Sequence, residues 1–128
     1  MIDTEAANDA PRAGAPIDFE RLREVSADDV ELMNELVELY FVQTRELLDE
    51  MQTALAAGNG EQLYRAAHKA LGSSLTCGMN HVVESLRELE QAGRDNDFDK
   101  AKTLLASAEN GFAELKEYLE SNREQLSN

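Results

Sequence analysis

His68 is the side chain of this sequence best suited to group-transfer chemistry, and it lies in a stretch with helical periodicity at about residues 61–77. An α-helix turns by about 100° per residue, so the residues that share a face follow from their spacing. One face collects small or apolar residues: Leu63, Ala66, Ala67, Ala70, Ser74 and Cys77. This face is suited to close packing against other helices. His68 falls on the opposite side, so we expect its imidazole to point into solvent.

The neighbours of His68 on the outward face suggest contact with another protein. Neutral imidazole is a good nucleophile and needs no assisting base at cytosolic pH. Tyr64, Leu71 and Leu75 fall within about 60° of His68 around the helix, and we expect them to form an exposed docking patch. Gly72 follows one turn later, where glycine costs close to 1 kcal/mol relative to alanine. We interpret this glycine as clearance that lets a partner protein or a phosphoryl group approach the imidazole.

Two simpler interpretations of this helix stay open. An isolated histidine on a helix is usually an ordinary surface residue, and Leu71 and Leu75 could bury against the preceding helix because the apolar stripe of a bundle helix is broad. Ser73 and Ser74 are expected to be packing or capping residues rather than nucleophiles, because the sequence places no base beside them.

Metal and nucleotide sites are not expected. Cys77 and His81 are four residues apart, but Gly78 is expected to interrupt the helix between them, and two ligands are too few for structural zinc. The Gly58-Asn59-Gly60 segment has neither the following lysine nor the preceding strand of a phosphate-binding loop. We therefore expect no bound metal, no ATP site and no cofactor.

Four stretches of helical periodicity position these residues. They cover about residues 28–57, 61–77, 80–93 and 98–122. Ser26 with Asp29 resembles a capping box for the first, Asn59 can cap the second, and Gly93 is expected to end the third. Turns of two to four residues force neighbouring helices to be antiparallel. The sequence therefore predicts an all-α, antiparallel up-down-up-down four-helix bundle, with a short N-terminal helical segment that contains Ile17, Phe19 and Leu22.

The ends of the chain lack this periodicity. Residues 1–16 are rich in alanine and are interpreted as a flexible leader, residues 17–124 as the bundle and residues 125–128 as a frayed tail. No stretch approaches the roughly 18 apolar residues of a membrane span.

The net charge limits the classes of partner that we expect, and the cysteine content limits the expected cellular compartment. Twelve Lys and Arg against 26 Asp and Glu give a net charge of −14, which disfavours nucleic acid and anionic membrane surfaces as partners. A single cysteine cannot form a disulfide within the chain, and no secretory signal pattern begins it. We expect a cytoplasmic monomer.

The segment Ala67-His68-Lys69-Ala70-Leu71-Gly72-Ser73-Ser74 resembles the His-x-x-x-Gly-Ser-Ser motif of histidine-containing phosphotransfer (HPt) domains. The resemblance covers roughly residues 17–120. It includes Ile17-Asp18, the long helix with Glu38-Leu39-Tyr40-Phe41, the turn Ala56-Ala57-Gly58, Arg65, Gly78 and Leu86-Arg87-Glu88-Leu89-Glu90. One residue departs from the pattern, because Leu71 stands where the family commonly has a lysine, three residues after the histidine. Lys69 or Arg65 would then have to supply the cation beside a phosphate, with Gly72 and Ser73 completing the motif.

The resemblance implies a phosphorelay intermediate. His68 would accept a phosphoryl group reversibly from the aspartate of a receiver domain and pass it to another receiver. The receiver would bring Mg²⁺ and the transfer chemistry, so the chain would be a carrier rather than an enzyme. The implied partners are response-regulator receiver domains and a sensor or hybrid histidine kinase. The alternative is a helical adaptor that is not phosphorylated and docks signalling proteins through the patch around His68.

Overall fold

The computed structural model describes residues 15–127, so residues 1–14 of the predicted leader and residue 128 lie outside the described part. Helices form nearly all of the described chain. They are α2 (Phe19–Val25), α3 (Val30–Ala57), α4 (Gly60–Cys77), the 3₁₀-helix η1 (Asn80–Val82), α5 (Val83–Asp95), α6 (Phe98–Ser121) and the 3₁₀-helix η2 (Arg123–Leu126). No strand occurs between residues 15 and 127. The all-α prediction is confirmed.

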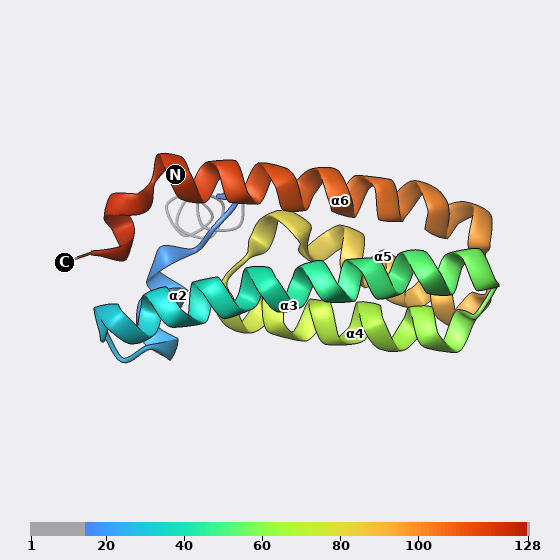
Figure 1. The fold of residues 1–128 in the computed structure, drawn as a ribbon, viewed down its shortest axis with the longest axis horizontal. Coiled ribbons are helices and arrows are strands. Elements are labelled where there is room, and N and C mark those ends of the chain that lie inside the picture. Colours follow the sequence, from blue (N-terminus) through green and yellow to red (C-terminus); the bar gives the residue numbers. More distant parts are fainter. Residues whose placement is uncertain (1–14, 128) are drawn as a thin grey trace, which may run out of the picture.

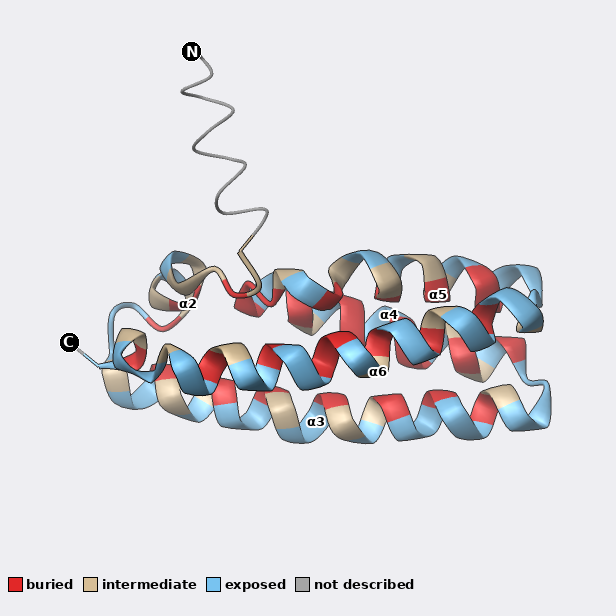
Figure 2. Ribbon diagram, turned by 90° about the horizontal axis from the view of Figure 1, so that it is seen from above, coloured by how far each residue is buried: buried red, intermediate tan, exposed pale blue. Residues whose placement is uncertain are grey.

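The four helices from α3 to α6 lie side by side around one core (Figure 1). α4 packs against both α3 and α5, and α6 packs against both α5 and α3. Their buried residues gather on the sides that face the other helices (Figure 2). Aliphatic side chains such as Leu48, Leu63, Leu89 and Leu115 dominate this core, and each is at most 1% exposed. α4 therefore has a buried side and an outer side, and the outer side is available to a partner.

The start of α3 differs from the predicted capping box. Asp29 is the N-cap, and its side chain accepts a hydrogen bond from the backbone N–H of Leu32. Ala27 and Asp28 have φ values of 53° and 62°, so the chain makes a left-handed turn there and the helix begins later than residue 28. Ser26 is buried instead at the end of α2, and its hydroxyl donates to the carbonyl of Leu22.

The third predicted helix also has different ends. Its first turn is the 3₁₀-helix η1. α5 then continues past Gly93 to Asp95, and the next residue, Asn96, adopts the left-handed conformation with φ 54°. Gly93 lies inside the helix and is buried against α4. A Cβ atom at Gly93 would lie 2.7 Å from the backbone nitrogen of Tyr64. The glycine therefore allows close packing of α4 and α5 rather than ending the helix.

Gly93→Ala is expected to destabilise the protein by about 1–3 kcal/mol, because the added methyl group must push α5 away from the α4 backbone. Gly72→Ala is the matched control, since a Cβ at Gly72 would meet no atom within 4 Å. That change should raise stability by up to about 1 kcal/mol through helix propensity. Urea unfolding of both variants measures the difference, and equal stabilities would contradict the close packing described at Gly93.

Residues 123–126, which include the first two residues of the predicted frayed tail, pack onto the bundle. η2 carries Leu126, which is 2% exposed, and the carbonyl of Leu126 accepts a hydrogen bond from the Asn34 side chain. Gln125 accepts a hydrogen bond from Arg23 of α2. At the other end, the Pro16 carbonyl accepts from the backbone N–H of His81. Both ends of the described chain are thus tied to the helices.

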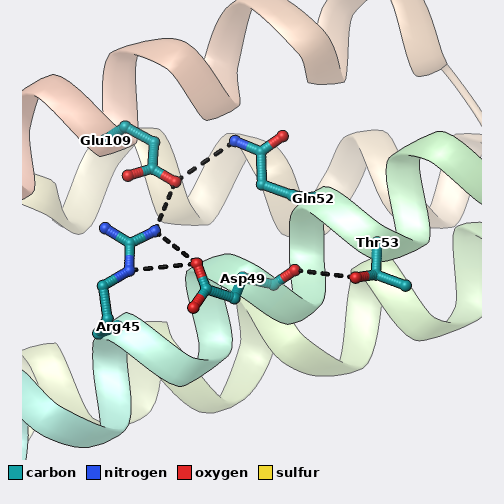
Figure 3. Close-up of polar contacts among 5 residues, drawn as sticks. All are labelled: Arg45, Asp49, Gln52, Thr53 and Glu109. Carbon is teal, nitrogen blue, oxygen red and sulfur yellow. Dashed lines mark hydrogen bonds and ion pairs between the residues drawn. The ribbon is translucent and has the colours of Figure 1, made fainter.

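A polar cluster joins α3 to α6 on the outside of the bundle (Figure 3). Arg45 donates to Asp49 at 2.9 Å and to Glu109 of α6 at 2.8 Å, and Gln52 also donates to Glu109. The Arg45 guanidinium lies 5.7 Å from the centroid of the Phe112 ring. The hydrogen bond from Arg45 holds the pKa of the Glu109 carboxyl below its ordinary value of 4.5.

This lowered pKa gives stability a pH dependence. Because the folded-state pKa of Glu109 is below the unfolded one, its contribution is fully present above about pH 4.5 and is lost as the pH falls through the folded pKa. Glu109→Gln should cost about 1 kcal/mol or less at pH 7, since Arg45 is partly exposed. In the Glu109→Gln variant, the free energy of unfolding should also fall less steeply as the pH is lowered. Urea unfolding between pH 7 and 3 measures both effects, with the exposed Glu117→Gln as control; an unchanged pH slope in Glu109→Gln would be inconsistent with the pairing.

Candidate functional site

His68 lies on the outer side of α4, as the sequence predicted, with its side chain 64% exposed. α4 begins at Gly60 because the Asn59 side chain caps it by accepting from the backbone N–H of Gln62. It ends at Gly78, whose φ is 71°. The helix presents the imidazole to solvent from a rigid and well-packed support.

Glu90 of α5 contacts His68, a contact that the sequence did not predict. Nδ1 of His68 and Oε2 of Glu90 are 2.6 Å apart, and the Glu90 side chain is only 15% exposed. A carboxylate at this distance favours the tautomer in which Nδ1 carries the proton and donates it to the carboxylate. Nε2 then holds the free electron pair. The site is therefore a histidine whose orientation and tautomer are set by a second helix.

Tyr64 and Arg94 complete this side of the site. The Tyr64 ring lies one turn before His68, with the ring centroids 5.9 Å apart. Arg94 of α5 lies over the Tyr64 ring at 4.5 Å and donates a hydrogen bond to its hydroxyl group at 3.1 Å. Tyr64 is therefore half-buried and held against α5 rather than fully exposed.

The predicted docking patch is only partly exposed. Leu71 is 6% exposed and belongs to the core, so the expectation that it lies on the outer surface is wrong. α4 packs against both α3 and α5, so its buried face is broader than the six small or apolar residues predicted to form it. Leu75 is 48% exposed and is available to a partner.

Gly72 and the two serines have distinct surroundings. Gly72 is exposed, and the space where its side chain would lie is open, so packing within the chain does not require a glycine there. Ser74 is buried, donates to the Ala70 carbonyl and bonds the Tyr40 hydroxyl of α3 at 2.7 Å. Burial raises the pKa of Tyr40 to about 12, which keeps this group protonated. Ser73 donates to backbone carbonyls of its own helix.

The basic residues predicted to support a phosphate lie on the other flank of His68. Arg65 forms an ion pair with Glu61 of its own helix at 2.7 Å. Lys69 lines a shallow hollow together with His68 and with Glu50 of α3. It forms no ion pair with any residue between 15 and 127. A role for Lys69, Arg65 or Ser73 toward a phosphate stays a prediction.

Cys77 and His81 form no common site. Cys77 is buried, and burial raises the pKa of its thiol. His81 bonds through Nε2 to Glu114 of α6 at 2.7 Å. No group of three or more metal-ligating side chains occurs in the described part of the chain. Within the same residues, no helix combines the length and the apolar character needed to cross a bilayer.

Comparison with known proteins adds independent findings. Residues 35–126 match the family model of the Hpt domain. No curated protein matches the sequence. Among solved structures, the chain is similar to histidine-containing phosphotransfer protein B (HptB) from Pseudomonas aeruginosa PAO1, with 23% sequence identity and a TM-score of 0.78. The match covers 86% of this chain and 96% of the other. At this level of identity the structural match shows the fold.

Proposed function

This chain belongs to the Hpt domain family, and we propose that His68 is the residue that carries its phosphoryl group in a phosphorelay. The observation that carries the proposal is the pairing of His68 with Glu90. An exposed imidazole whose Nδ1 is held by a carboxylate has its Nε2 free for attack. The other histidine of the chain, His81, is bonded to Glu114 through Nε2 and lacks this arrangement.

The geometry supports a direct transfer between a receiver aspartate and Nε2. The Nε2 electron pair attacks the phosphorus of the aspartyl phosphate, the N–P bond forms, and the P–O bond to the aspartate breaks as its carboxylate leaves with the electron pair. The imidazole keeps its proton on Nδ1 and becomes positively charged as the N–P bond forms. The Glu90 carboxylate, 2.6 Å from Nδ1, stabilises that charge. The reverse sequence delivers the group to a second receiver.

The chain acts in this proposal as a carrier and not as an enzyme with its own ATP site. Phosphoryl transfer depends mainly on alignment and on neutralising the charge of the moving group. The receiver domain would supply Mg²⁺ and the aspartate, and a sensor or hybrid kinase would phosphorylate that receiver. An antiparallel up-down-up-down bundle gives His68 a rigid support, and Leu75 with the Gly72 backbone offers a surface for the receiver. We place this activity in the cytoplasm, with the chain as a monomer.

The proposal is tested by incubating the purified protein with Mg²⁺ and a receiver domain whose aspartyl phosphate carries the label. The expected label is stable in base and labile in acid, as for phosphohistidine, and it passes to a second, unphosphorylated receiver. A folded protein that binds several receivers but takes no label from any of them would refute the carrier function. The same result would favour the helical adaptor.

Glu90 is expected to act as a positioning residue for His68. Glu90→Ala removes the hydrogen bond to Nδ1, so the ring can rotate and the transfer rate should fall by up to about 100-fold. Glu90→Gln keeps an oxygen acceptor for the Nδ1 proton and should retain more of the rate. Single-turnover transfer from a receiver measures both variants. If Glu90→Ala and Glu90→Gln transferred at the wild-type rate, Glu90 would have no positioning role.

A further inference from the structure

The proposed phosphohistidine raises an electrostatic problem that the residues of α4 do not solve. A phosphoryl group carries close to two negative charges at neutral pH. It would stand on a protein of net charge −14, next to Glu90 and about two turns from Glu61. Leu71 is buried and uncharged, and Arg65 already forms an ion pair with Glu61. A further cation must neutralise the group if transfer is to be efficient.

The hydrogen bond to Glu90 decides on which side of α4 that cation must lie. It holds the Nδ1 edge of the imidazole against α5, so residues of α5 lie beside the ring. Lys69 is about 100° further round the helix and lines the hollow that includes Glu50 of α3. His68 lines the same hollow, so Lys69 flanks the ring on the α3 side and Glu90 flanks it on the α5 side.

The contacts between α4 and α5 show which residue of α5 lies at the right height. Gly60 lies against Asn96, Tyr64 contacts Arg94, and His68 contacts Glu90. From residue 64 to residue 68, one turn forward along α4 thus corresponds to one turn backward along α5. The next turn places residues 71–72 of α4 opposite residues 86–87 of α5.

Residues 86 and 87 face different ways. Leu86 is 1% exposed and belongs to the core, whereas Arg87 is exposed and lies about 60° from Glu90 around α5. Arg87 forms no ion pair and no hydrogen bond with another side chain in the described part of the chain. Arg94 lies one turn after Glu90 along α5, and its guanidinium contacts the Tyr64 ring and hydroxyl group.

We propose that Arg87 of α5 is the cation that neutralises the phosphoryl group on His68, in place of a lysine at position 71 of α4. This inference rests on the proposed function of His68. The guanidinium of Arg87 would approach the phosphoryl oxygens from the α5 side, across the open space above Gly72. An arginine can make two parallel hydrogen bonds to such oxygens.

The test uses phosphoramidate to phosphorylate His68 without a receiver, so that docking plays no part. In ³¹P NMR titrations, Arg87→Ala should move the ionisation midpoint of the phosphoryl group up by roughly half a pH unit, because a neighbouring cation favours the dianion. Arg87→Lys should keep the midpoint near that of wild type. Transfer from a phosphorylated receiver should fall about 10-fold or more in Arg87→Ala. Arg87 is exposed, so thermal melting should show all variants folded.

The competing cations provide the matched controls. Lys69→Ala and Arg65→Ala should each shift the midpoint by less than Arg87→Ala does. A shift in Lys69→Ala with none in Arg87→Ala would overturn the inference while leaving the proposed function of His68 intact. A wild-type protein that accepts phosphate from neither phosphoramidate nor a receiver would overturn the proposed function and this inference together.

Discussion

A His68→Gln variant is expected to accept no phosphoryl group from a phosphorylated receiver domain. Glutamine has no nucleophilic ring nitrogen, so the N–P bond cannot form. The side chain is 64% exposed and packs little, so the fold should tolerate the change. Acid-labile label on the protein after incubation with the receiver and Mg²⁺ measures the loss, and circular dichroism checks the fold.

The chain offers a matched control because it has only two histidines. His81→Gln removes an imidazole that is likewise paired with a glutamate, here Glu114 of α6. The His81→Gln variant should take up the same amount of label as the wild-type protein. If His68→Gln is still labelled and His81→Gln is not, the phosphoryl group has been assigned to the wrong histidine.

The second large effect concerns Gly72. A leucine at this position should abolish or strongly reduce phosphoryl transfer, because its side chain would occupy the outer surface one turn from His68, where we propose that the phosphoryl group and the receiver enter. The space is open within the chain, so the variant should fold and should be at least as stable as wild type. Single-turnover transfer and urea unfolding together measure the two expectations.

Thr76→Leu is the control for the added apolar bulk. Thr76 is exposed on the same side of α4, one turn beyond Gly72 and further from His68. The Thr76→Leu variant should accept the phosphoryl group at close to the wild-type rate. Equal transfer rates for Gly72→Leu and wild type would show that this glycine does not provide clearance for the phosphoryl group or the receiver. A Gly72→Leu protein that does not fold would contradict the open space described at this position.

Local patterns in the sequence were sufficient to predict the helices and the outward direction of His68. The cap at Asn59 and the stop at Gly78 depend on residues next to the helix they end, and both were predicted. Gly93 was misinterpreted because its role is set by the α4 backbone, 2.7 Å from its missing Cβ. The sequence alone does not distinguish a glycine that ends a helix from a glycine that lets another helix approach closely.

The site was predictable only in the part that belongs to one helix. Glu90 is 22 residues away from His68 in the chain, and its contact depends on how α4 and α5 align. The available signal was a carboxylate on the helix expected to follow α4 in an antiparallel arrangement. Leu71 was misplaced because the width of the buried face of α4 depends on the helices packed on both of its sides and does not follow from the periodicity of α4 alone.

The measurement that tests the central claim most directly is a ¹⁵N–³¹P NMR experiment on the phosphorylated protein with ¹⁵N-labelled histidine. It shows which ring nitrogen of which histidine is bonded to phosphorus. The structure predicts a bond to Nε2 of His68 alone, because Nδ1 of His68 is held by Glu90 and Nε2 of His81 is held by Glu114. Phosphorus on Nδ1 of His68, on His81, or on no histidine of a labelled protein would contradict the account.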